Sequence, residues 1–143
     1  MATVELRFSA LPEHVRTARL VAAAVARRAG VDEAVLDEVR LAVGEACTRA
    51  VGLHQHSGIS APVKVLLIEE EKQFSIEVGD EAPHATPGRT SGDGPDTDVE
   101  TEEDEMGLAV ISGLVDDVEV SAGKSGGSIR MRWPTAPPPT LLV

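Results

Sequence analysis

The spacing of hydrophobic residues changes several times along this chain, and these changes limit the folds it can adopt. In residues 3–9 apolar and polar side chains alternate, which predicts a half-buried strand. Residues 12–29 and 32–54 instead carry apolar side chains at helical spacing, and Gly30 separates the two segments. Pro12 stands in the first turn, where a helix needs no N–H. The first third of the chain therefore predicts a strand followed by two helices.

The remainder of the chain predicts four more strands and a short helix. Two hairpin strands, the helix and two closing strands are expected at residues 63–69, 73–79, 107–114, 115–121 and 128–133. This order indicates an α+β two-layer sandwich, in which a mixed, mostly antiparallel sheet carries the helices on one face. We expect one domain over residues 1–133 and a Pro-rich, disordered tail over residues 134–143.

Composition restricts the core and the partners. Aromatic residues make up only 2% of the chain, so the core must be built from Val, Leu, Ile and Ala. The apolar runs are too short to span a bilayer, and no basic start precedes an apolar run, so we expect neither a membrane segment nor a signal peptide. The single cysteine, Cys47, excludes an internal disulfide and fits a reducing cytoplasm. A net charge of −11 argues against direct nucleic-acid binding and favours a protein or small-ligand partner.

Residues 82–105 have no periodicity and are strongly acidic. Between positions 85 and 105 stand eight acidic residues and one arginine, a net charge of −7. Little apolar surface is available there to offset the entropy of ordering, which predicts a mobile loop over residues 83–104. Two interpretations of its charge stay open: a solvated loop, or a negatively charged segment that docks on a basic protein surface.

Residues 40–51, RLAVGEACTRAV, resemble the helix that carries the Mg-ATP site in the anti-sigma factor serine kinases, small bacterial members of the GHKL (HATPase_c) superfamily. In that family the helix reads R-L-A-V-x-E-A-x-x-N-A. The resemblance implies that Glu45 is the base or water-positioning residue and that Arg49 stands where an asparagine ligates magnesium. A guanidinium has five donors and no acceptor, so Arg49 cannot ligate a metal. Its spacing does allow an ion pair with Glu45.

A second family motif, D-x-G-x-G after the hairpin, corresponds to VGDEAPH at residues 78–84. The resemblance implies that Asp80 accepts from the amino group of adenine, while Ala82 and His84 replace the two glycines. An aspartate in a turn that ends a strand is the other interpretation of Asp80.

The third motif is the lid-closing G-x-G before an apolar helix, whose N-terminal amides hold the phosphates in the family. EMGLAVI at residues 105–111 keeps Gly107 and has Ala109 at the second glycine. Ser128 follows two glycines and resembles the family's G-T segment near the phosphates. The resemblance thus implies a flexible ATP lid before Gly107 and an ATP site whose positions are mostly altered.

Two other candidates come from the residues themselves. His54 and His56 stand at alternate positions near a helix end; a metal site is one interpretation, and an exposed polar helix end is the favoured one. Cys47 lies on the same helix with no base placed beside it, which favours a small core residue over a nucleophile.

The resemblance implies a cytoplasmic, homodimeric anti-sigma factor-like regulator. Such a protein binds a sigma factor and a STAS-type anti-sigma factor antagonist. The altered motifs predict weak or lost use of ATP or ADP with magnesium, and therefore no required cofactor. Two alternatives stay open: an active ATP-dependent serine/threonine kinase that phosphorylates the antagonist, and a GHKL-like interaction domain with another protein partner.

Overall fold

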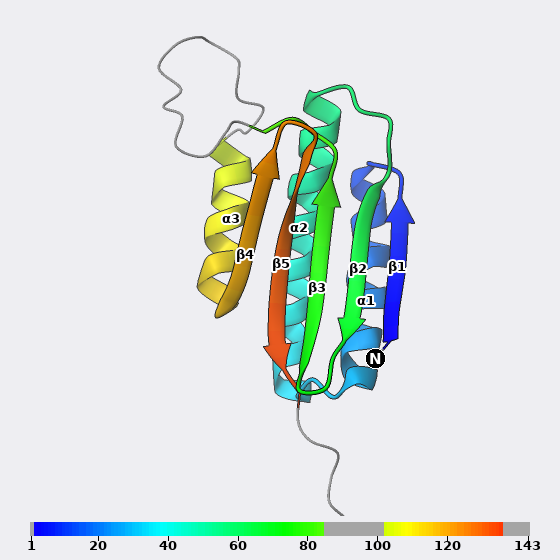
Figure 1. Cartoon of the computed structure of the whole chain (residues 1–143), viewed down its shortest axis with the longest axis vertical. Coiled ribbons are helices and arrows are strands. Elements are labelled where there is room, and N and C mark those ends of the chain that lie inside the picture. Colours follow the sequence, from blue (N-terminus) through cyan, green and yellow to red (C-terminus); the bar gives the residue numbers. More distant parts are fainter. Residues whose placement is uncertain (1, 85–101, 136–143) are drawn as a thin grey trace, which may run out of the picture.

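The computed structural model of the chain describes residues 2–84 and 102–135, with side chains described over 2–84 and 106–135. One five-stranded sheet carries three α-helices on a single face (Figure 1). The elements are β1 (Ala2–Phe8), α1 (Val15–Ala29), α2 (Leu36–His56), β2 (Val63–Glu69), β3 (Gln73–Asp80), α3 (Glu102–Leu114), β4 (Asp117–Gly123) and β5 (Gly126–Pro134). The predicted two-layer α+β architecture is confirmed.

Local signals set the ends of the first two helices. A 3-10 turn at Pro12–His14 leads into α1, and Gly30 ends that helix in the left-handed region at φ 102°. A second 3-10 turn precedes α2, and the Asp32 side chain accepts a hydrogen bond from the backbone N–H of Ala34 at 3.0 Å. Glycine is the residue that adopts positive φ at least cost, and aspartate is a preferred N-cap, so both boundaries follow from the sequence.

The strands follow the order β1-β2-β3-β5-β4, and every pairing within the described part of the chain is antiparallel. The sheet expected to be mixed is therefore fully antiparallel here. The last strand, β5, returns between β3 and β4. In its register Ile129 lies opposite Val78 of β3 and Val120 of β4. The same side of the sheet, which faces the helices, also carries Phe74, Met131 and Trp133.

Small side chains let the two long helices approach the sheet and each other closely. Ala22 and Ala26 of α1 and Ala42 and Ala46 of α2 are at most 1% exposed. The core also takes in Trp133, the only tryptophan, whose indole Nε1–H donates to Glu38 of α2 at 3.3 Å. A core dominated by Val, Leu, Ile and Ala is what the shortage of aromatic residues predicted.

Several boundaries differ from those expected, most of all at the start of α3 and at the end of β5. Helix α3 begins at Glu102 rather than at residue 107, so the end of the predicted acidic loop is helical. Acidic residues in a first helical turn are favourable because of the helix dipole. A search for hydrophobic periodicity does not detect a turn of this kind. Strand β5 extends through Pro134, and Thr135 N–H donates to the carbonyl of Lys72 at 3.1 Å. Most of the predicted mobile loop, residues 85–101, and the tail from residue 136 lie outside the described residues.

No helix in the described ranges 2–84 and 102–135 is both long and apolar enough to cross a bilayer.

Candidate functional site

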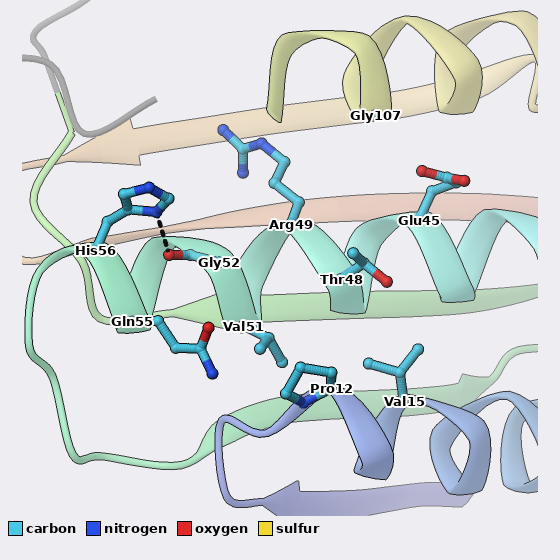
Figure 2. A pocket seen from close by; sticks show the side chains of 10 residues that line it. All are labelled: Pro12, Val15, Glu45, Thr48, Arg49, Val51, Gly52, Gln55, His56 and Gly107. Atoms are coloured by element: carbon cyan, nitrogen blue, oxygen red, sulfur yellow. Dashed lines mark hydrogen bonds between the residues drawn. The ribbon is translucent and has the colours of Figure 1, made fainter. Parts of the chain in front are cut away.

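The first group of predicted site residues lies where α2 faces α3. Figure 2 shows Glu45 and Arg49 leaving α2 on the same side, toward the helix that carries Gly107. These residues help to line a hollow of about 240 Å³. Thr48, Gln55 and His56 contribute polar groups to its wall, and His56 itself hydrogen-bonds to the carbonyl of Gly52 at 2.8 Å.

Arg49 is the more buried of the two charged residues, Glu45 and Arg49, that line this hollow. It is only 5% exposed, whereas Glu45 is half-buried. The ion pair that their spacing allows does not occur among the ion pairs of the described residues, and Figure 2 draws no hydrogen bond between them. A buried guanidinium offers only donors and a positive charge. Arg49 therefore cannot supply the magnesium ligand that the resemblance implies at this position.

Helix α3 contributes to the hollow through its middle rather than through its N-terminus. A Cβ built on Gly107 would lie 3.7 Å from Glu45 Oε2, an ordinary contact distance. Because the helix starts at Glu102, the N–H groups of Gly107 and Ala109 lie inside it, where an α-helix directs them to its own carbonyls. Ala109 is also exposed. Gly107 and Ala109 therefore lie in the body of α3 and not at its N-terminus, where the family's phosphate-holding amides are expected.

The second group lies at the end of β3. Asp80 Oδ1 accepts hydrogen bonds from the imidazole Nε2–H of His84 at 2.8 Å and from the backbone N–H of Ala82 at 3.0 Å. The side chains of Asp80 and His84 are 3% and 2% exposed, and Ala82 is fully buried. The bond from Asp80 to the amide two residues later is an Asx turn, which matches the interpretation of Asp80 as a turn residue. The sequence placed these residues together but did not anticipate their pairing.

Ser128 lies on the opposite side of the sheet from Arg49. It precedes the buried Ile129 in β5, and strand geometry directs neighbouring side chains to opposite faces. There it lines a separate hollow of about 480 Å³ together with Lys64 and Glu77. The structure therefore groups Glu45, Arg49 and Gly107, and it groups Asp80, Ala82 and His84 at the end of β3. Ser128 shares the lining of its hollow with Asp80, while Ala109 lies in neither group.

The structure places the His54 side chain differently from the sequence interpretation. It was expected on an exposed helix end, but it is fully buried, while His56 is exposed as expected. Its Nε2 accepts from the N–H of Glu81 at 2.9 Å, so Nδ1 carries the proton and donates to the carbonyl of Ala61 at 2.9 Å. The signal was present: His54 continues the four-residue repeat of buried alanines at 42, 46 and 50.

Metal-binding geometry is not found around these histidines. No group of three or more His, Cys, Asp or Glu side chains in the described segments is arranged to hold a metal ion. Cys47 is fully buried in the core, as predicted, and burial raises the pKa of its thiol to about 12. A thiol that stays protonated at neutral pH is a poor nucleophile.

Comparisons with known proteins place these features in context. The family model of the histidine kinase-like ATPase domain matches residues 8–133. The chain is 33% identical over 138 residues to serine-protein kinase RsbW of Bacillus pumilus, covering 90% of this chain and 83% of the relative. It is 29% identical over 132 residues to the anti-sigma F factor of Clostridium acetobutylicum, covering 87% of each.

A solved structure supports the fold. The RsbU and RsbW domains of Rv1364c from Mycobacterium tuberculosis align with a TM-score of 0.66 at 16% identity. The alignment covers 92% of this chain and 31% of the solved chain, so this chain spans under a third of that protein's length.

Proposed function

Because this chain belongs to the histidine kinase-like ATPase domain family, in the group that includes the serine-protein kinase RsbW, we propose that it is an anti-sigma factor-like regulator. It binds a sigma factor and a STAS-type antagonist as a cytoplasmic homodimer, and it uses ATP weakly or not at all. The names of its relatives, a serine-protein kinase and an anti-sigma factor, support this class of protein.

The observation that carries partner binding is an exposed face of α1 and α2. Leu20 and Leu41 are 58% and 47% exposed, and both line a hollow of about 320 Å³ between the two helices. Arg16, Arg19 and Arg40 line the same hollow, as does Asp37, which is ion-paired with Arg40. We call the two leucines and the three arginines the Leu-Arg face. Exposed leucines surrounded by arginines, on a chain of net charge −11, suit a protein partner with apolar and acidic side chains.

The proposed loss of ATP use rests on the two groups of altered residues. Phosphoryl transfer needs metal ions that bridge the phosphate oxygens. At the position implied for a metal ligand, Arg49 places a buried, positively charged guanidinium, and this group has no acceptor atom of its own. The Asp80 carboxylate already accepts two hydrogen bonds within the protein. Glu45 stays available as a base, but a base alone does not transfer a phosphoryl group.

Partner binding is tested by affinity capture from the native cytoplasm, followed by calorimetry with the sigma factor and antagonist recovered. The double variant Leu20→Glu, Leu41→Glu should weaken binding at least tenfold, because it removes the apolar centre of the face and repels an acidic partner. Val120→Glu is the matched control, since Val120 is 52% exposed on β4, away from the face. Recovery of some other protein class in place of both partners would favour the interaction-domain alternative.

Nucleotide use is tested by titrating Mg-ATP and Mg-ADP into the purified protein. We expect weak or undetectable binding, and Arg49→Asn alone should not restore it because Asp80 stays paired with His84. The kinase alternative would replace this proposal if the unmodified protein phosphorylated an antagonist serine in a magnesium-dependent reaction that Glu45→Ala abolished. Light scattering checks the homodimer independently.

A further inference from the structure

The buried pair of Asp80 and His84 has a feature that the proposed function does not use. A carboxylate with 3% exposure loses most of its hydration, and such a group is costly unless hydrogen bonds replace the water. The imidazole Nε2–H supplies one of these bonds at 2.8 Å, and the Ala82 amide supplies the other. The His84 ring therefore does for Asp80 what a bound heterocycle with an N–H donor would do.

The surrounding backbone leaves room for this ring. A Cβ at Gly127 of β5 would lie 2.8 Å from His84 Nε2 and 3.1 Å from His84 Cδ2. Because Gly127 has no side chain, the ring can occupy this space. The backbone is also anchored, because His84 N–H donates to the carbonyl of Gly123 at 2.9 Å. Gly126, at φ 144°, lets the β4–β5 turn pass close to the Asp80 carbonyl.

We infer that His84 is an internal ligand of Asp80. The protein's own imidazole occupies a site that would otherwise accept a planar heterocycle with an N–H donor. The inference deepens the proposed loss of nucleotide use. It rests on that proposal in one respect, the identity of the ligand that the ring excludes. An external ligand must first displace the ring. Even a flexible tether holds a group at an effective concentration on the order of millimolar, and a ring anchored by the fold competes more strongly.

The test removes the internal ligand and supplies a substitute. In His84→Gly the ring is deleted, leaving Asp80 buried beside a cavity, and the melting temperature should fall by roughly 10 °C. Free imidazole at about ten times its dissociation constant should then raise the melting temperature of this variant by about 4 °C. Fluorescence of the buried Trp133 reports the transition at pH 7.5.

Two variants serve as controls. His84→Gln keeps a side-chain N–H donor and should melt closer to the unmodified protein, with no response to imidazole. His56→Ala removes an exposed imidazole whose hydrogen bond within the described residues is to a helix carbonyl, and it should also show no response. The unmodified protein should be equally indifferent, because its own ring fills the site.

The inference is overturned if imidazole leaves His84→Gly unchanged or stabilises all of the variants equally. If His84→Gly fails to fold, the unmodified protein decides the matter: long-range ¹H–¹⁵N NMR should show an Nε2 proton on His84 that exchanges slowly, and rapid exchange there would refute the internal ligand. Binding of Mg-ATP by the unmodified protein would instead overturn the proposed function, without changing the imidazole result.

Discussion

Replacing His54 should show how far the end of α2 depends on one imidazole. The ring is fully buried and joins three segments: α2, the connection at Ala61, and Glu81 just after β3. Deleting a buried ring costs about 3 kcal/mol at the lower end of values for aromatic residues. The two backbone partners add less than a fully buried pair would, because Ala61 is half-buried and Glu81 is exposed, so water can reach them. We expect His54→Ala to lower the free energy of unfolding by about 3 kcal/mol.

Two conservative variants separate the hydrogen bonds from the cavity. In His54→Asn the amide nitrogen lies near the position of Nδ1 and keeps the bond to Ala61. In His54→Gln the longer side chain brings an oxygen near the position of Nε2 and keeps the bond from Glu81. Each should cost about 1–2 kcal/mol, less than the alanine variant, because each preserves one bond and most of the volume.

Urea unfolding followed by Trp133 fluorescence measures these differences. With an m-value of about 2 kcal/mol/M, a loss of 3 kcal/mol lowers the midpoint by about 1.5 M. His56→Ala is the control and should change the free energy of unfolding by less than about 0.5 kcal/mol, since His56 is exposed. A cost below about 1 kcal/mol for His54→Ala, or equal costs for all three His54 variants, would refute this assignment of the two bonds.

Two further predictions concern the interior of α2 and α3. Burial raises the pKa of the Cys47 thiol from about 9 to about 12, so above pH 9 the unfolded chain binds fewer protons than the folded one. The free energy of unfolding should therefore fall by about 1.4 kcal/mol per pH unit between pH 9 and 12 through this group. Urea titrations of Cys47→Ala should lack that contribution. Identical slopes of unfolding free energy against pH for the two proteins would contradict the prediction. Gly107→Ala should raise the free energy of unfolding by about 0.5–1 kcal/mol, because the residue lies inside α3 and its new Cβ would meet Glu45 only at ordinary contact distance. Gly113→Ala, whose Cβ meets nothing within 4 Å, is the matched control, and a loss at Gly107 alone would indicate a close approach that the structure does not show.

Much of the fold follows from signals that lie within a few residues of each other. The helical spacing in α1 and α2, the glycine at position 30 and the cap at Asp32 define both helices, and alternation defines the β2–β3 hairpin. These features depend on backbone geometry and on which face of each element is apolar, and both can be read along the chain. The start of α3 could not be found this way, because its first turn is acidic and carries no hydrophobic period.

The site depended on contacts between distant segments. Position 49 could be recognised as altered from its residue type alone, since no arrangement gives arginine an acceptor. By contrast, the sequence did not show that His54 would reach Glu81, or that the space over Gly127 would hold the His84 ring. Burial of a polar side chain is set by what other elements bring next to it. Here the return of β5 beside β3 sets the place of His84, and only the assembled sheet and helices decide that Asp80 is satisfied from within.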